Sequence, residues 1–341
     1  MRQDHKPLSH PLITSLKPPF VSRAPLRVSF VGGGSDLPEY FEAYGGMCIG
    51  AAITKYNRLS VADSSDADSC YQCIMESGVT RQDSNGAKIV QSAFETIKRG
   101  GSDRRCFRSH LDLTELGSGL GASGSLAVAA IMAAARLSEQ CLSQGEVAQT
   151  AYFVERELCG FPVGKQDHYA SAFGGFNVFT FHGNGDVDAN PLRISTSRLQ
   201  ELEHWLLLVR STRVSSGHEI ARIHKNSLRA CPSAISLQHA IKREVEPFAS
   251  AIEVGAFDKA ALILGRVWKL KRQIAVPISN QHIDNMYQIA LSAGALGGKL
   301  MGAGAGGHLL LMAPPDLHPQ IYKRFHLAPP MPVEFDMEGV K

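Results

Sequence analysis

Apolar and polar residues alternate over short stretches in the first third of the chain, which is the pattern of half-buried β-strands. Leu26, Val28 and Phe30 alternate with polar residues, and this pattern stops at three consecutive glycines. Apolar residues return over 47–53 and again over 59–62. We therefore expect a strand over 26–30, followed by two further strands.

Other stretches repeat apolar residues every three or four positions, as amphipathic helices do. One such stripe begins at Ile89 and ends before Gly100 and Gly101, and glycine is a common helix stop. Ser143 and Glu146 have the spacing of a capping box at the start of another stripe, which continues towards residue 160. These patterns predict two helices.

The second half of the chain is richer in long charged helices, which we expect over 233–254 and 257–274. Apolar runs predict strands over 176–181 and 205–209, and a last strand-like segment near 333–335 returns to a sheet. This order of strands and helices indicates a mixed α/β or α+β protein. A chain of 341 residues, 44% of them hydrophobic, can bury a sizeable core and is expected to form two domains.

Two glycine tracts are the strongest chemical signal. The sequence GSGLGASGSLA over 117–127 runs into an alanine-rich apolar helix. A glycine-rich loop that leads into a helix N-terminus presents unpaired N–H groups and the positive end of the helix dipole, and so can hold phosphate. The sequence GAGAGG over 302–307 follows a predicted helix and leads into a predicted strand over 308–312. Together they suggest a site assembled from both halves of the chain.

Common nucleotide-binding motifs do not fit these tracts. Both match GxGxxG, which is weak evidence by itself. A dinucleotide-binding fold needs a strand after the first helix, with an acidic residue about 20 positions beyond the glycines. Here the helix leads instead into the polar sequence SEQCLSQGE. Around Gly297-Gly298-Lys299, Ala293 and Leu300 occupy two positions that a Walker A loop requires for Gly and Ser or Thr. Tight turns and close packing points remain the alternative interpretation.

Charge and hydropathy narrow the classes of partner. The formal net charge of +3 is near neutral for this length and argues neither for nor against a nucleic-acid surface. The basic residues are scattered rather than grouped in blocks, and we expect no nucleic-acid partner. No apolar run reaches the roughly 20 residues of a membrane span, so no membrane partner is expected. Residues 1–22 lack the apolar region of a signal peptide and are interpreted as a flexible N-terminal tail.

Cysteine usage favours a reducing compartment, and we expect a cytoplasmic protein. The chain has seven cysteines, an odd number with no regular framework. Cys70 and Cys73 form a CxxC pair, but no second CxxC or HxxxH accompanies them. Ordinary positions in a strand or turn are therefore favoured over a zinc or redox site.

Three tracts together resemble the signature motifs of the GHMP kinase superfamily. They are RAPLRVSFVGGGSDLPEYFEAYGG, GSGLGASGSLAVA and GKLMGAGAGGHLLLM, in that order. Within the superfamily, GGGSDLPEY and GKQDHYASAFGGFNVF resemble most the sugar kinases that phosphorylate D-glycero-α-D-manno-heptose 7-phosphate at the anomeric hydroxyl, with fucokinase domains next. The resemblance covers about residues 23–340.

The resemblance implies an α+β fold with the active site in a cleft between two domains. The N-terminal ATP-binding domain, 23–190, would contain an unusual left-handed βαβ crossover, and the C-terminal domain, 191–341, would be ferredoxin-like. The implied function is ATP-dependent phosphorylation of the heptose 7-phosphate to the 1,7-bisphosphate, for synthesis of a nucleotide-activated heptose. Kinases for fucose or another unphosphorylated sugar, and a non-catalytic sensor on the same fold, remain alternatives. A homodimer is also allowed.

The resemblance assigns ATP and Mg²⁺ to the second motif. Backbone amides, a helix N-terminus and Mg²⁺ can stabilise phosphoryl transfer without a P-loop lysine. Ser123 and Glu155 match the metal-binding hydroxyl and carboxylate, although Glu155 also suits a solvated helix face. Many relatives have consecutive serines where this chain has Ala122, Ser123 and Gly124. The implied ATP-binding residues are Gly117, Gly119, Leu120, Gly121, Ala122, Ser123, Gly124 and Ser125.

Asp167 corresponds to the catalytic aspartate of the family, which accepts the proton of the attacking hydroxyl or orients that hydroxyl. Arg27 matches a cation placed near this aspartate and the transferred phosphoryl group. A helix-capping role for Asp167 and a solvent-facing position for Arg27 are the structural alternatives.

The expected sugar contacts come from both halves of the chain. Asp36 can accept hydrogen bonds from sugar hydroxyls, although it also suits a helix N-cap. A phosphate on the substrate would need a cation, for which Arg213 and the pair Lys271-Arg272 are candidates, each against the alternative of a solvated side chain. The full set of expected substrate residues is Gly34, Ser35, Asp36, Gly304, Gly306, Arg213, Lys271 and Arg272.

Overall fold

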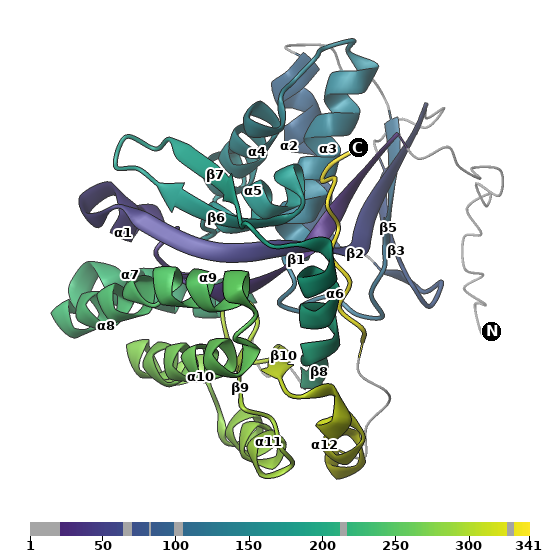
Figure 1. Ribbon diagram of the computed structural model, residues 1–341. Helices are drawn as coiled ribbons and strands as arrows, with labels where there is room; N and C mark the ends of the chain where they lie inside the picture. Colours follow the sequence, from purple (N-terminus) through teal and green to yellow (C-terminus); the bar gives the residue numbers. More distant parts are fainter. Residues whose placement is uncertain (1–20, 64–69, 82, 99–104, 212–216, 326–330) are drawn as a thin grey trace, which may run out of the picture.

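The computed structural model describes residues 21–63, 70–81, 83–98, 105–211, 217–325 and 331–341, and its strands form two sheets (Figure 1). The larger sheet has the order β4-β3-β5-β2-β6-β7, and β1 also pairs with β2; the smaller is β8-β10-β9. The strands are β1 (Ser22–Val31), β2 (Gly46–Asp63), β3 (Cys70–Met75), β4 (Thr80–Arg81), β5 (Arg105–Leu111), β6 (Phe176–Phe181), β7 (Val187–Pro191), β8 (Leu206–Ser211), β9 (Gly297–Leu300) and β10 (Gly307–Met312).

Helices cover the larger sheet on one side, and the smaller sheet with its own helices lies on the other. Figure 1 shows α2 to α5 above the larger sheet and α7 to α12 below it. The helical segments are α1 (Pro38–Tyr44), α2 (Ser84–Lys98), α3 (Ala122–Leu137), α4 (Gln144–Phe153), η1 (Val154–Leu158), α5 (Gln166–Phe173), α6 (Thr196–Trp205), α7 (Gly217–Ala230), α8 (Pro232–Arg243), α9 (Val245–Val254), α10 (Phe257–Ile274), η2 (Val276–Ile278), α11 (Gln281–Ser292), η3 (Pro315–Leu317) and α12 (His318–Phe325).

The fold is the expected mixture of helices and strands in two domains. β3 and β5 are parallel neighbours joined through α2, and such a parallel pair is what a βαβ crossover requires. The hand of this crossover stays a prediction. None of the helices in the described part of the chain combines the length and hydropathy that a bilayer span would need.

The two strands predicted over 47–53 and 59–62 are one long strand, β2, so that prediction was wrong. Polar residues interrupt the apolar pattern between them without interrupting the strand, because their side chains find partners. Asn57, for example, is buried, and its amide donates to the Ala122 carbonyl at 2.8 Å. β2 pairs with β1, β5 and β6 and so organises the larger sheet.

The predicted helices are present, with two corrections. The capping box is confirmed, since Ser143 Oγ accepts from Glu146 N–H and the Glu146 carboxylate accepts from Ser143 N–H at 2.8 Å. The helix that follows turns into the π-helix η1 after Phe153. The segment 233–254 is two helices, α8 and α9, because the ring of Pro247 in a continuous helix would clash with the carbonyl four residues earlier.

The second glycine tract follows β9 rather than a helix, so it links two antiparallel strands of the smaller sheet. β9 escaped prediction because it begins with two glycines, which are poor strand formers. Glycine is needed there: a Cβ on Gly297 would clash with the Ala261 carbonyl of α10.

The chain end returns to a sheet, as expected; the sheet is the larger one, and the contact is an isolated bridge between Ile53 and Phe335 rather than a strand. Asp336 N–H donates to the Ala52 carbonyl at 3.0 Å, and Lys341 N–H donates to the Arg23 carbonyl at 2.9 Å. The last residues therefore contact the N-terminal domain.

The cysteines of the CxxC pair lie in β3, and Cys73 is free and buried. Cys73 therefore occupies an ordinary strand position, as expected. Cys106, in β5, is disulfide-bonded, so the seven cysteines are not all thiols.

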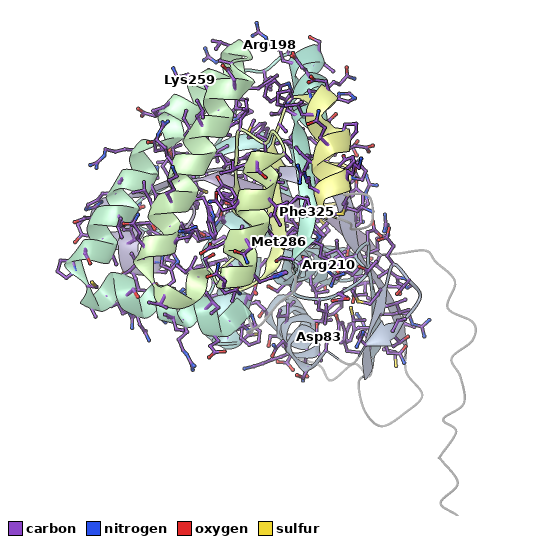
Figure 2. All side chains as sticks on the ribbon, turned by 90° about the horizontal axis from the view of Figure 1, so that it is seen from below. Asp83, Arg198, Arg210, Lys259, Met286 and Phe325 are labelled. Atoms are coloured by element: carbon purple, nitrogen blue, oxygen red, sulfur yellow. The ribbon has the colours of Figure 1, made fainter. Side chains whose placement is uncertain are left out.

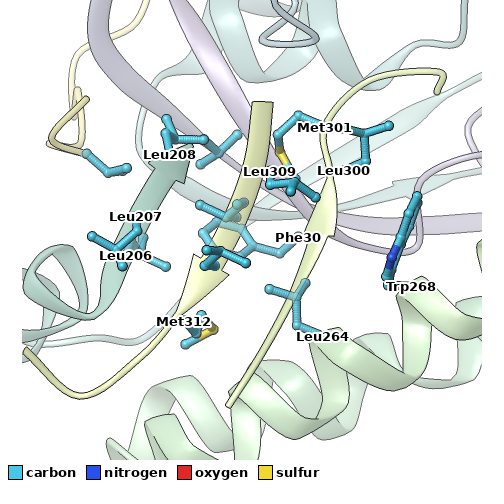
Figure 3. Packing of buried hydrophobic residues seen from close by; sticks show 14 of the residues in the cluster. Phe30, Leu206, Leu207, Leu208, Leu264, Trp268, Leu300, Met301, Leu309 and Met312 are labelled. Atoms are coloured by element: carbon cyan, nitrogen blue, oxygen red, sulfur yellow. The ribbon is translucent and has the colours of Figure 1, made fainter. Parts of the chain in front are cut away.

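One hydrophobic core joins the two sheets. Figure 3 shows Phe30 of β1 among leucines of β8 and β10, with Leu264 and Trp268 of α10 on the side of the helices. Figure 2 views the same helices from below, with Arg198 and Lys259 at one end of the molecule and Asp83 towards the other. This shared packing fixes how the two domains meet.

Candidate active site

A cavity of about 500 Å³ takes its wall from both domains. The N-terminal domain contributes residues of β1, the loop before α1, the first glycine tract and the start of α5. The C-terminal domain contributes residues of α7, the end of α10, β9 and the second glycine tract. The cavity is therefore in the place that the two tracts predicted.

The first glycine tract forms a loop directly before α3. Gly119 and Gly121 have φ of +78° and +75°, a conformation that side chains disfavour. Gly121 is the N-cap of α3, and no side chain caps the first turn. The N-terminal end of a 16-residue helix therefore borders the cavity with amide N–H groups available to an anion.

The two glycine tracts touch each other. A Cβ on Gly119 would lie 2.5 Å from the Met301 carbonyl oxygen, and a Cβ on Gly302 would lie 2.8 Å from Gly119 Cα. His308 N–H also donates to the Ser118 carbonyl at 3.0 Å. Absence of side chains at these glycines lets the C-terminal domain close against the anion-binding loop.

Arg27 and Asp167 form an ion pair on the cavity wall. Arg27 donates through Nε to Asp167 Oδ1 at 2.8 Å and through Nη1 to the Gly119 carbonyl at 2.7 Å, and its Nη2 lies 2.7 Å from the same Oδ1. The arginine is 4% exposed, so the solvent-facing alternative was wrong. One side chain thus connects the carboxylate to the glycine loop.

Asp167 lies in the first turn of α5 but does not cap it, because the N-cap is Lys165. A Cβ on Gly124 of α3 would lie 2.8 Å from Asp167 Cβ. Glycine at this position allows the N-terminus of α3 and the carboxylate to border the same space. A carboxylate beside an anion-binding loop can accept a proton from a hydroxyl that attacks a bound phosphate.

The loop before α1 places a second carboxylate on the wall. Asp36 is 3% exposed, and its Oδ1 accepts from Gly34 N–H at 2.8 Å, while its Oδ2 accepts from Gln166 N–H at 3.2 Å. Burial, followed by the charge of Asp167, raises the pKa of Asp36. The N-cap of α1 is Leu37, so the capping alternative for Asp36 was wrong.

Gly34 borders the cavity, whereas Ser35 does not. Ser35 is fully buried, and its hydroxyl donates within the protein to the carbonyls of Gly32 and Met47, both at 2.8 Å. We therefore correct its predicted sugar contact to a role in holding the loop.

Two buried lysines reach the wall from the C-terminal domain. Lys271 Nζ donates to the Gly302 carbonyl and Lys299 Nζ to the Ser29 carbonyl, both at 2.6 Å. Burial, and then the charge of Arg27, lowers the pKa of Lys271 to about 8. Burial, followed by the charge of Lys271, lowers the pKa of Lys299 well below its usual value.

Arg272 points away from this wall. Its Nη1 donates to Asp284 Oδ1 at 2.9 Å, and it does not border the cavity. We therefore correct its place among the substrate residues. Arg213 lies outside the described residues.

Some of the remaining expected residues border the cavity, and others are buried behind its wall. Gly117, Gly119, Gly121, Ala122 and Ser123 border the cavity. Leu120, Gly124 and Ser125 are buried behind it, and Ser125 Oγ donates to the Ala24 carbonyl at 3.0 Å. In the second tract, Gly302 and Ala303 border the cavity, whereas Gly304 and Gly306 do not.

Glu155 is not on the cavity wall. It is fully buried, so the solvated alternative was wrong, and its Oε2 is 2.7 Å from His168 Nε2. Its Oε1 has no hydrogen-bond partner. Across the described residues, no cluster of three or more His, Cys, Asp or Glu side chains could hold a metal.

Several polar wall residues were not predicted, among them Lys299, Gln166 and His224. Lys299 lies in the motif GKLMGAGAGGHLLLM, but no role was expected for it. Gln166 lies in the GKQD sequence beside Asp167. Gln166 donates through Nε2 to Asp36 Oδ1 at 3.2 Å and accepts from Ser29 Oγ at 2.7 Å. His224 carries no sequence signal beyond its place in a helical pattern.

Sequence comparisons identify the family to which the chain belongs. The GHMP kinases N terminal domain matches residues 88–175, and the GHMP kinases C terminal domain matches 248–327. The D-glycero-alpha-D-manno-heptose 7-phosphate kinase of Campylobacter jejuni is 32% identical over 305 residues, which cover 86% of this chain and 89% of that protein.

Two further relatives extend the comparison. The bifunctional fucokinase/GDP-fucose pyrophosphorylase of Arabidopsis thaliana is 27% identical over 85% of this chain, which covers 29% of that longer protein. A crystal structure of a D-glycero-D-manno-heptose 1-phosphate kinase from Bacteroides thetaiotaomicron has a TM-score of 0.73 at 26% identity, over 94% of this chain and 97% of that one. With both domains matched and a relative above 30% identity over most of its length, the chain belongs to the GHMP kinase family.

Proposed function

We propose that this protein is an ATP-dependent sugar kinase that phosphorylates the anomeric hydroxyl of D-glycero-D-manno-heptose 7-phosphate to give the 1,7-bisphosphate. The observation that carries the proposal is the Arg27–Asp167 pair, bonded to the first glycine tract within one cavity. The similarity to the Campylobacter jejuni heptose 7-phosphate kinase supports the substrate class. The product would feed the synthesis of a nucleotide-activated heptose.

In this reaction Asp167 accepts the proton of the attacking hydroxyl. The hydroxyl oxygen forms a bond to the γ-phosphorus of ATP, and the bond from that phosphorus to the β,γ-bridging oxygen breaks, so ADP leaves. Arg27 fixes the carboxylate and adds positive charge near the transferred group. The amides at the start of α3 hold the phosphates of ATP.

Mg²⁺ fits this site as an ion bound mainly through the phosphates of ATP, because Mg²⁺ in proteins takes few protein ligands. Ser123 on the wall would offer its hydroxyl. Glu155 is fully buried away from the cavity wall, so its side chain would have to move to bring the unpaired Oε1 to the ion. When bound, the ion neutralises charge on the phosphates.

Lys271 is the cation that we propose for the phosphate already on the sugar. It borders the cavity beside Gly302, while Arg272 does not. The names of the two bacterial relatives differ in the position of this phosphate, and the plant relative is a fucokinase. A kinase for fucose or another unphosphorylated sugar is therefore the second candidate.

A substrate screen tests the proposal. Initial rates of ATP consumption would be measured with heptose 7-phosphate, heptose 1-phosphate, unphosphorylated heptose, fucose and galactose, and without sugar. We expect kcat/KM for heptose 7-phosphate to exceed that for the unphosphorylated heptose by about tenfold or more, as a charge-assisted phosphate contact predicts. A preference for an unphosphorylated sugar would favour the second candidate, and no sugar-dependent rate would contradict both.

The assembly and the compartment are also proposals. A kinase that uses ATP suits the cytoplasm, and a homodimer is compatible with the fold. Sedimentation of the purified protein would measure its oligomeric state.

A further inference from the structure

The start of α5 is built around Asp36, one of the carboxylates on the cavity wall. Lys165 N–H donates to the Asp36 backbone carbonyl and Gln166 N–H donates to Asp36 Oδ2, both at 3.2 Å. The Gln166 side chain adds a third contact, because its Nε2 donates to Asp36 Oδ1 at 3.2 Å. Gly164 allows this close approach, since a Cβ there would clash with Asp36 Oδ2. Asp167 follows in the same turn, so the start of one helix holds both carboxylates.

The orientation of the Gln166 amide is fixed from its other end. Ser29 Oγ donates to Gln166 Oε1 at 2.7 Å. An ionised carboxylate only accepts hydrogen bonds, so the amide nitrogen has to face Asp36 and the amide oxygen has to face Ser29. The Ser29 carbonyl in turn accepts from Lys299 Nζ at 2.6 Å. A chain of contacts therefore runs from β9 of the C-terminal domain through β1 and α5 to the loop before α1.

Asp36, Gln166 and Ser29 all border the cavity. Asp36 is the expected acceptor for a sugar hydroxyl, and a charged acceptor makes a stronger hydrogen bond than a neutral one. Burial, followed by the charge of Asp167, raises the pKa of Asp36, whereas the backbone N–H groups of Gly34 and Gln166 lower it. Each donor on the carboxylate favours its ionised form, and the Gln166 side chain adds one more donor.

We propose that Gln166 is a positioning residue that orients the Asp36 carboxylate towards one hydroxyl of the sugar and so helps to select the substrate. The inference rests on the proposed sugar kinase function. Gln166 acts through Asp36 and takes no part in the proton transfer assigned to Asp167. Because Gln166 and Asp167 are neighbours in the chain, this contact also ties the position of the recognised hydroxyl to the position of the base.

Kinetics of Gln166→Met test this role. Methionine is of similar length and suits a helix, but it cannot donate to Asp36. The sugar used is whichever one the wild-type protein phosphorylates fastest in the substrate screen. We expect its KM to rise about tenfold or more, as the loss of a hydrogen bond to a charged group predicts, while kcat stays within about threefold. The KM for ATP should stay within about twofold.

Analogues of that sugar that lack one hydroxyl each identify the group that Asp36 binds. With the wild type, we expect one analogue to lose about tenfold or more in kcat/KM. Gln166→Met should lower kcat/KM for the parent sugar and the other analogues, but little for that one, because the hydroxyl that Asp36 would bind is absent. If Gln166→Met costs the same factor with every analogue, Gln166 does not act through Asp36 and the proposal is wrong.

Two further variants separate positioning from folding. Ser29→Ala frees the Gln166 amide without removing it, and we expect a smaller rise in the KM for the sugar, of about threefold. Gln200→Met, at an exposed position of α6 away from the cavity, should behave as the wild type. Thermal unfolding of each variant checks that it is folded, and Ser29→Ala carries the test if Gln166→Met is not.

Two results would overturn the proposal. An unchanged KM for the sugar in the folded variants would show that Asp36 does not depend on Gln166. A fall in kcat with an unchanged KM would show that the substitution acts on α5 and Asp167 instead.

The test also separates this proposal from the function on which it rests. A wild type that phosphorylates a sugar other than a heptose phosphate overturns the proposed substrate, yet that sugar and its analogues still test Gln166. A wild type that phosphorylates no sugar overturns both.

Discussion

Charges of both signs lie on the cavity wall. Arg27, Lys271 and Lys299 lie there with the carboxylates of Asp36 and Asp167, and the carboxylate of Asp83 also borders the cavity. Arg27, Asp36, Lys271 and Lys299 are buried and the Asp167 side chain is 25% exposed, and low exposure to water strengthens their interactions with a ligand that enters. Each is held by a hydrogen bond within the protein, and the wall is therefore formed before the ligand arrives.

Lys271 predicts a pH dependence. Its folded-state pKa of about 8 lies below its usual 10.5, so the ammonium is present below pH 8 and is lost as pH rises through that value. If it holds the sugar phosphate, kcat/KM for that substrate should fall above about pH 8, by tenfold per pH unit, while the KM for ATP changes little. Initial rates between pH 6 and about 10 would measure this.

Lys271→Arg is the matched variant, because a guanidinium stays protonated across this range. Its profile should lose the decline above pH 8. The neighbouring groups that also face Lys271 are Arg27, Asp36, Asp167, His224 and Lys299. A decline that persists in Lys271→Arg would assign the titration to one of them and contradict the phosphate contact.

Sequence motifs could predict some of these residues and not others. Arg27 and Asp167 stand in tracts whose order identifies a kinase family, so their roles could be expected before their geometry was known. Lys299 lies in a short strand and His224 in an amphipathic helix. The spacing of apolar residues does not distinguish these two positions from other polar positions in such elements. Their burial follows from how the two domains close, which no local pattern contains.

Helices of the two domains are joined by a buried carboxylate. Glu39 of α1 is 2% exposed in its side chain, and its Oε1 lies 2.7 Å from Arg156 Nη2 of η1, 3.0 Å from Arg229 Nη2 and 3.5 Å from Lys225 Nζ of α7. Arg156 also donates to the Val163 carbonyl on the cavity wall at 2.7 Å. This cluster connects the π-helix to the cavity wall at Val163.

Removal of this carboxylate should destabilise the fold. Glu39→Ala leaves the buried Arg156 with only the exposed Glu157, 3.8 Å from its Nε, as a counter-charge, and we expect the free energy of unfolding to fall by about 3 kcal/mol. Urea unfolding would measure the change. Glu201→Ala, at an exposed position of α6, is the control and should stay within about 0.5 kcal/mol of the wild type. Equal stability of the two variants would show that the cluster contributes nothing.

Helices and strands in which apolar residues recur at a regular spacing could be predicted well. The helix over 257–274 and the strands at 26–30 and 176–181 lie where the apolar pattern placed them. The errors fall where tertiary contacts override local pattern: β2 continues through polar residues that find buried partners, and β9 forms from glycines that allow contact with α10. Pro247 could have predicted the break at Glu244, but the helical pattern of apolar residues indicated one continuous helix.

At the scale of the whole molecule, the site exists only because the two halves meet. The glycine tracts touch at Gly119 and Gly302, Lys299 donates to the Ser29 carbonyl, and one hydrophobic core spans both sheets (Figure 3). The sequence predicted the meeting of the two tracts. It also predicted that a segment near 333–335 returns to a sheet, but not that this sheet is the larger one, in the N-terminal domain.

The central claim is that this cavity transfers a phosphoryl group with Asp167 as the base. Asp167→Asn keeps the shape of the side chain but cannot accept the proton in the same way, so kcat should fall by about two orders of magnitude or more. The most direct measurement combines this kcat with the Kd for ATP in the same folded variant. We predict the large loss of kcat with a nearly unchanged Kd for ATP, and near-wild-type turnover in folded Asp167→Asn would contradict the account.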